Sequence, residues 1–197
     1  MASDDLLSDS ASRRAFLRTA GAGLAGGSGV LLAACGGSSK PARPTVASAY
    51  QAQVRDADIS VLNGVLDLEH TAIAAYTAGI PLLTGHARVA ATWFLGQELQ
   101  HAAKLEATIT GAGGKANPAQ ASYDLGNPSN ADQVLELLHR TETSLLSAYL
   151  DALPRLIPGW LRAVAAGILA NESQHLSVLQ AAQGRNPVPG AFVTAHA

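Results

Sequence analysis

The sequence predicts an all-α protein, a four-helix bundle of two antiparallel hairpins joined by a long crossover. Alanine and leucine dominate the chain and only 5% of residues are aromatic, a mix that favours helix over strand. Apolar residues recur at spacings of three and four in four long stretches, as on one face of a helix. Two short connections and one long connection separate these stretches, which is the pattern of paired hairpins.

The first hairpin is predicted from helices at about 54–78 and 86–110. Gly79, with a proline two residues later, ends the first helix, and a glycine-rich segment from Gly111 ends the second. Both helices carry an apolar stripe, and a few polar residues lie within these stripes. The polar residues are Glu69, Glu98 and His101.

The second hairpin is organised in the same way. Its first helix begins at Ala131, with Ser129 or Asn130 as the N-cap, and ends before Pro154. Its second helix is predicted at about 159–183, where a glycine follows. The polar residues within these stripes are Glu142, Glu172 and His175.

The lengths of the connections predict how the hairpins are joined. Residues 80–85 and 154–158 are short links, so the helices on either side of each link should be antiparallel neighbours. The segment 112–130 has 19 residues and is rich in Gly, Pro, Asn and Ser. Such a segment reaches roughly 60 Å when extended, whereas a helix of about 25 residues is roughly 37 Å long. The long segment can therefore cross the whole bundle.

Matching residues recur between the two hairpins. Pairs 73 residues apart are Glu69–Glu142, Tyr76–Tyr149 and Pro81–Pro154, and pairs 74 residues apart are Arg88–Arg162, Glu98–Glu172 and His101–His175. The one-residue difference falls in a hairpin turn, where an insertion is tolerated. We interpret this repeat as a duplicated helical hairpin.

The polar residues on the stripes suit a metal centre. A Glu-x-x-His spacing, at Glu98 and again at Glu172, puts a carboxylate and an imidazole on one helix face. A single such pair is also typical of a solvated helix face, but burying unpaired carboxylates is costly. Four carboxylates and two neutral imidazoles balance two divalent cations, and these ligands suit iron or manganese. The sequence therefore predicts a site for two Fe or Mn ions.

These residues resemble the ferritin-like superfamily of di-iron and di-manganese carboxylate proteins. The resemblance covers about 56–183, and Leu68-Glu69-His70 near Ala74-Ala75-Tyr76 is most similar to the ferritin-like domain family that includes desiccation-related proteins. It implies a ferritin-like four-helix bundle in which Glu69 and Glu142 are metal ligands. It also implies that each Glu-x-x-His motif, Glu98/His101 and Glu172/His175, contributes one bridging carboxylate and one histidine.

Other residues are candidates for a place around the metal ligands. Tyr76 and Tyr149 lie two turns beyond a predicted ligand, so we interpret them as core aromatics with a hydrogen-bonded hydroxyl or as redox relays. His139 lies one turn before Glu142 and is an outer-shell or extra-ligand candidate. Trp93 is expected to pack near a helix end.

The N-terminus reads as an export signal. Arg13 and Arg14 precede an apolar segment too short to span a bilayer, and Leu-Ala-Ala-Cys follows. This order resembles a twin-arginine signal with a lipoprotein box, which implies cleavage before Cys35 and lipid attachment to it; the alternative is a disordered tail. We expect a signal at 1–34, a flexible spacer at 35–53, the bundle at 54–184 and an irregular tail at 185–197.

Composition narrows the function classes. A net charge of −2 with no basic block argues against nucleic acid as a partner. The leading hypothesis is an exported, lipid-anchored dinuclear protein on the outer face of the cell membrane. It would oxidise Fe(II) or react with O2 or peroxide, in protection against stress. The alternatives are a manganese catalase-like enzyme and a non-catalytic stress-related bundle. The sequence leaves the oligomeric state open, a homo-oligomer included, and the short tail argues against a mineral-storing cage.

Overall fold

The structure, a computed structural model, describes residues 54–192. These residues form α3 (Asp56–Gly79), η1 (Ile80–Leu82), α4 (Gly85–Gly111), α5 (Ala131–Ala152) and α6 (Gly159–Ala182), with no strand among them. The predicted all-α class and four helices are confirmed. The predicted export signal with Arg13 and Arg14, the spacer with Cys35, and the last residues of the tail lie outside the described residues.

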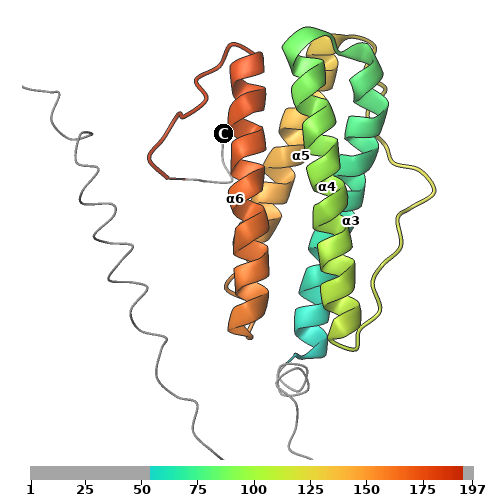
Figure 1. The fold of residues 1–197 in the computed structure, drawn as a ribbon, viewed down its shortest axis with the longest axis vertical. Helices are drawn as coiled ribbons and strands as arrows, with labels where there is room; N and C mark the ends of the chain where they lie inside the picture. Colours follow the sequence, from blue (N-terminus) through green and yellow to red (C-terminus); the bar gives the residue numbers. More distant parts are fainter. Residues whose placement is uncertain (1–53, 193–197) are drawn as a thin grey trace, which may run out of the picture. The chain divides into compact units, whose positions relative to one another are not determined.

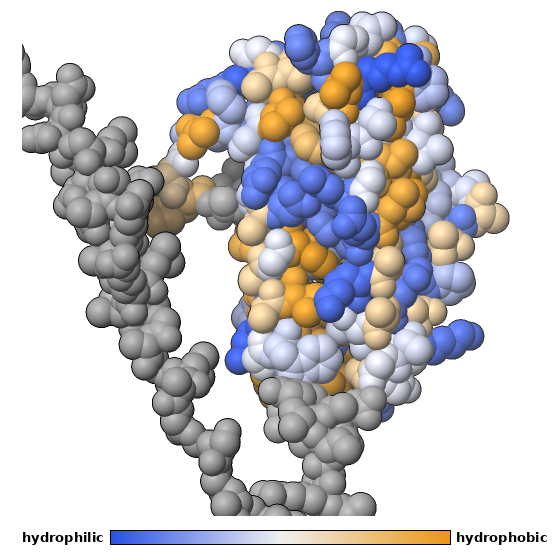
Figure 2. All heavy atoms as spheres, in the orientation of Figure 1, coloured by the Kyte–Doolittle hydropathy of each residue, from blue (hydrophilic) through white to orange (hydrophobic). Residues whose placement is uncertain are grey.

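The helices form two antiparallel hairpins, as Figure 1 shows. α3 and α4 are joined through η1, α5 and α6 through a short turn, and the crossover 112–130 runs the length of the bundle. α3 packs closely against α4 and α5, and α5 packs closely against α6. α4 and α6, by contrast, contact each other at few points. The face that they form shows hydrophilic and hydrophobic side chains interspersed in Figure 2.

Local chemistry explains where the helices begin and end. The side chain of Asn130 accepts a hydrogen bond from the backbone N–H of Gln133 (3.0 Å), which makes Asn130 the N-cap of α5. Gly113, just after α4, and Gly184, just after α6, have φ values of +85° and +70°, which favour glycine. No helix among the described residues is long and apolar enough to cross a membrane.

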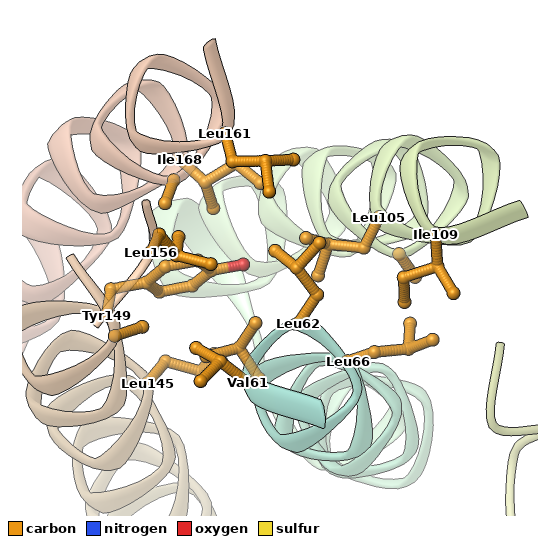
Figure 3. Close-up of a cluster of buried hydrophobic side chains, with 14 of the residues drawn as sticks. Val61, Leu62, Leu66, Leu105, Ile109, Leu145, Tyr149, Leu156, Leu161 and Ile168 are labelled. Atoms are coloured by element: carbon orange, nitrogen blue, oxygen red, sulfur yellow. The ribbon is translucent and has the colours of Figure 1, made fainter. Parts of the chain in front are cut away.

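The core consists of two apolar clusters at different levels of the bundle. The larger cluster, drawn in Figure 3, includes Val61, Leu62, Leu66, Leu105, Ile109, Leu145, Tyr149, Leu156, Leu161 and Ile168. The smaller cluster includes Tyr76, Leu83, Phe94, Val134, Leu138 and Leu179. Every helix contributes to both clusters. On α4, α5 and α6 the predicted metal ligands lie between the two contributions, and on α3 Glu69 lies near the end of the contribution to the larger cluster. The candidate site is therefore enclosed by apolar side chains on both sides along the bundle axis.

The prediction that Trp93 packs near a helix end is wrong. Its side chain is 71% exposed on α4, so it does not pack in the core. The reason is its place on the outer side of α4, away from the buried face marked by Phe94 and Glu98.

Asp58 joins the start of α3 to the turn before α6. Its buried carboxylate accepts hydrogen bonds from the Arg55 side chain (3.0 Å from Nε) and from the backbone N–H of Ile157 (2.9 Å). The Arg55 guanidinium, helped by that N–H, outweighs the effect of burial and lowers the pKa of Asp58 to about 2. One carboxylate thus ties the two hairpins together at one end of the bundle.

We predict that Asp58→Asn lowers the free energy of unfolding at pH 7 and costs about half as much at pH 3. A carboxyl whose pKa is lower in the folded chain stabilises the fold above its unfolded pKa. The contribution of Asp58 should be about 1–2 kcal/mol, allowing for solvent screening around Arg55, and should fade as the pH falls from about 4 to about 2. Urea unfolding at both pH values measures it. Asp56→Asn, an exposed first-turn acid, is the control, and equal losses in both variants would contradict the prediction.

Candidate dinuclear metal centre

All four helices contribute to one buried cluster of carboxylates and imidazoles. α3 provides Glu69, α5 provides Glu142, and the Glu-x-x-His motifs lie on α4 and α6. The four glutamates and His175 are fully buried, and the side chain of His101 is 11% exposed. The structure thus brings together all six predicted ligands, although they are spread over more than 100 residues of sequence.

The six residues form two overlapping groups of potential ligands. One group is Glu69, Glu98, His101 and Glu172; the other is Glu98, Glu142, Glu172 and His175. Within each group, one potential ligand atom from every residue lies within 4.8 Å of the others. Glu98 and Glu172 belong to both groups.

The two shared carboxylates each direct their oxygens toward both histidines. Glu98 directs Oε1 toward Nδ1 of His175 (2.9 Å) and Oε2 toward Nδ1 of His101 (3.6 Å). Glu172 directs Oε1 toward Nδ1 of His101 (2.8 Å) and Oε2 toward Nδ1 of His175 (3.4 Å). Each shared carboxylate therefore presents one oxygen to each group.

Two tyrosines hold the remaining glutamates from behind. The hydroxyl of Tyr76 on α3 donates a hydrogen bond to Oε1 of Glu142 on α5, and the hydroxyl of Tyr149 on α5 donates one to Oε1 of Glu69 on α3. Both tyrosines are fully buried. The two bonds cross between the helices as a matched pair, which agrees with the predicted duplication. They leave Oε2 of each glutamate without a donor.

The buried atoms without a hydrogen-bond partner test whether the cluster fits a metal. All six residues contribute such atoms: Oε2 of Glu69 and Glu142, both oxygens of Glu98 and Glu172, and Nδ1 of both histidines. Some of these atoms lie within 3 Å of one another, but none is aligned as a hydrogen bond. Leaving so many buried polar atoms unpartnered is costly. Carboxylate oxygens and imidazole nitrogens bind divalent Fe or Mn, so this set of atoms fits two such ions.

Comparison with known proteins agrees with the fold. The sequence matches the model of the ferritin-like domain family over residues 57–185. The chain belongs to the ferritin-like domain family. The predicted resemblance is confirmed at this level. A search of curated proteins gives no match.

Solved structures share the fold of this ferritin-like protein. A conserved hypothetical protein from Mycobacterium tuberculosis aligns with a TM-score of 0.63 and 22% identity, over 70% of this chain and 97% of the other. A protein described as ferritin like, diiron-carboxylate, from Bacillus anthracis aligns with a TM-score of 0.57 and 20% identity, over 64% of this chain and 94% of the other. At these identities the similarity establishes the fold.

Charge is shared unevenly among the carboxylates of the ferritin-like bundle. Burial, reinforced by neighbouring carboxylates, raises the pKa of Glu69 to about 8 and that of Glu142 well above its usual value. Burial acts in the same direction on Glu98 and Glu172. Their contacts with both imidazoles outweigh it and lower both pKa values, that of Glu172 to about 2. The carboxylates shared by both groups are therefore the ones that stay ionised.

The imidazoles carry the compensating charge when no metal is bound. Burial alone would lower their pKa values, but contacts with the surrounding carboxylates raise the pKa of His101 to about 12 and that of His175 to about 11. At pH 7 the metal-free cluster then holds about four protons more than it would with neutral imidazoles and ionised carboxylates. Each imidazole carries one extra proton, and Glu69 and Glu142 carry one each. This state is close to neutral.

Several other residues lie outside the cluster. His139 is buried, but no hydrogen bond or ion pair between described residues joins it to the six. Its pKa is lowered by burial and by the charge of Arg185. Its proposed outer-shell role stays a prediction. Sequence reasoning missed Gln97, whose Oε1 lies 2.5 Å from Nε2 of His175, and the stacking of Phe94 on that ring. In the sequence, the signal for these contacts is that Gln97 adjoins Glu98 and that Phe94 lies one turn before it.

We predict that binding two divalent cations releases about four protons per chain near pH 7, because ligands must lose their protons to bind. Affinity should therefore rise with pH. Calorimetric titration with Mn(II) in two buffers of different ionisation enthalpy measures the release. Glu142→Gln, which removes one titrating group, should release about one proton fewer. Binding without proton release would contradict this assignment of protons.

We also predict that Tyr149→Phe lowers the free energy of unfolding by about 1–3 kcal/mol, because a buried oxygen of Glu69 loses its donor. Tyr76→Phe should act similarly through Glu142. Tyr123→Phe is the matched control, since its hydroxyl accepts a backbone N–H in the exposed crossover and its loss should cost less than about 0.5 kcal/mol. Urea unfolding of the metal-free proteins measures all three, and a cost for Tyr123→Phe as large as for the buried tyrosines would argue against the role assigned here.

Proposed function

We propose that this ferritin-like protein binds two iron or manganese ions and uses them to oxidise Fe(II) or to react with O2 or peroxide. The observation that carries the proposal is the pair of overlapping ligand groups that share Glu98 and Glu172. A network of solvated polar side chains would not require two carboxylates that each direct one oxygen toward each of the two groups. The diiron-carboxylate description of the Bacillus anthracis protein, which shares the fold, supports iron.

The residues divide the work between the two positions. Glu69 and His101 would hold one ion from α3 and α4, Glu142 and His175 would hold the other from α5 and α6, and Glu98 and Glu172 would contribute to both. Two ions held in this way supply the electrons that O2 or peroxide takes up. Four carboxylates balance the charge of two divalent ions, so the loaded site is neutral while the imidazoles are neutral.

The surroundings of the site suit redox chemistry with small reactants. Apolar clusters on both sides along the bundle exclude water, which limits side reactions. His101 is the one member of the cluster that is not fully buried, which favours approach of an ion or a peroxide from its side. The hydrogen bonds from Tyr76 to Glu142 and from Tyr149 to Glu69 would hold these two carboxylates in place while ions bind.

The proposed location rests on the N-terminal sequence. Arg13 and Arg14, the apolar segment and Cys35 follow one another as in an exported lipoprotein. A lipid on Cys35 would hold the bundle at the outer face of the membrane, with 36–53 as the tether. A redox site placed there suits protection of the cell envelope against oxidative or drying stress.

We predict that the native chain binds about two Fe(II) ions anaerobically and oxidises them quickly when air is admitted. Glu98→Ala/Glu172→Ala should lose both properties, because it removes both shared ligands. Glu106→Ala/Glu136→Ala is the matched control, since it removes the same number of carboxylates outside the cluster and should behave as the native chain. Iron content and the ultraviolet absorbance of Fe(III) measure binding and oxidation.

The other outcomes assign the alternatives. Oxygen evolution from peroxide by the Mn(II)-loaded chain, without fast Fe(II) oxidation, would favour a catalase-type activity. Equal iron binding by the native chain and the Glu98→Ala/Glu172→Ala variant, or no binding by either, would overturn the proposal in favour of a structural polar network.

A further inference from the structure

The two histidines of the cluster have unequal neighbours. The residues that repeat between the hairpins are the ligands and the tyrosines behind them. The side chains that contact the imidazoles do not repeat. This difference lies between α4 and α6, the two helices that contact each other at few points.

His175 is held on two sides by residues of α4. Its Nε2 lies 2.5 Å from Oε1 of Gln97. The ring of Phe94 stacks on the imidazole with centroids 4.1 Å apart and planes at 25°. The side chain of His175 is fully buried. Both the tilt and the rotation of the ring are therefore fixed by the protein.

His101 has neither support. The position on α6 equivalent to Gln97 is Asn171, whose side chain is one methylene shorter and makes no hydrogen bond with any described residue. The position equivalent to Phe94 is Ile168, which has no ring to stack. The side chain of His101 is 11% exposed, against 0% for His175. The duplicated ligands thus lie in two different settings.

We propose that Gln97 is a positioning residue that makes the His175 position the tighter of the two metal positions, so that it fills first. The inference rests on the proposed dinuclear function. An amide oxygen only accepts hydrogen bonds, so in the neutral imidazole it places the proton on Nε2 and leaves the lone pair of Nδ1 directed at the cluster. Partners of this kind typically change metal affinity 10- to 100-fold. His101, without such a partner, has to be oriented by the incoming ion itself.

The test is an anaerobic titration of the full chain with Mn(II), followed by the electron paramagnetic resonance signal of free Mn(II). The native chain should bind in two separate steps. Gln97→Leu should weaken the first step about 10- to 100-fold. Asn171→Leu, the matched control at the equivalent position, should change either step less than about threefold. Gln97→Glu keeps the acceptor and should retain the tight step.

Two further variants identify which position fills first. His175→Ala should lose the tight step, whereas His101→Ala should keep it and lose the weak one. Thermal unfolding of each metal-free variant separates a lost ligand contact from a lost fold, since a folded Gln97→Leu chain with a weakened first step is the expected result.

Other outcomes overturn the inference in distinguishable ways. Two equal steps in the native chain, or equal weakening by Gln97→Leu and Asn171→Leu, would overturn the role of Gln97 while leaving the dinuclear site intact. A metal-free Gln97→Leu chain that is unfolded while Gln97→Glu binds weakly would assign Gln97 to the core instead. Absence of Mn(II) and Fe(II) binding by the native chain would overturn the proposed function and this inference together.

Discussion

The burial of four carboxylates in one layer of the core is the constraint on which the rest of this structure depends. Burial of this kind opposes folding unless the charge is balanced nearby. The chain offers two means of balance, two imidazoles with their protons or two divalent ions, and both require all six side chains to meet. Every helix contributes to the layer, and the shortest contact of each imidazole is with a carboxylate of the other hairpin. Because apolar clusters lie on either side, this polar layer is a continuous part of the buried core.

The same constraint explains why the helix pairs differ. α3 and α5 carry one ligand each and pack closely, and the crossed bonds from Tyr76 and Tyr149 connect each to the ligand of the other. α4 and α6 carry two ligands each and pack loosely. Across that looser seam the main connections within the site are polar ones, from Glu98 to His175 and from Glu172 to His101. Glutamates held by tyrosines on one side, and Glu-x-x-His pairs on two loosely packed helices on the other, suit a site whose ligands must change protonation when ions bind.

Sequence reasoning reached the fold and the six central residues because both leave periodic signals. The apolar stripes predicted the four helices, and the polar residues within the stripes predicted one buried polar layer. Contacts that depend on the stagger between helices left no such signal. Asp58 reaches the backbone of Ile157 only because the turn before α6 lies beside the start of α3. The exposure of Trp93 depends on the rotation of α4 about its axis, because neighbouring residues of a helix point about 100° apart. His139 shares the spacing of a ligand, yet the structure places it toward Arg185.

The repeated ligands of the two hairpins, and the residues beside them that do not repeat, together determine how the site binds metal. A repeated hairpin makes two equivalent sets of ligands, and equivalence alone would give two ions the same affinity. The side chains next to the ligands are free to differ, because they need only pack. One added methylene at Gln97 relative to Asn171 is enough to reach His175 across the α4–α6 seam. Phe94, at the position equivalent to the aliphatic Ile168, is enough to stack on the imidazole of His175. Differences of this size cost the fold little, since they leave the charge balance of the layer unchanged. They act only on the orientation of a ligand, where a small change in geometry has a large effect on metal affinity.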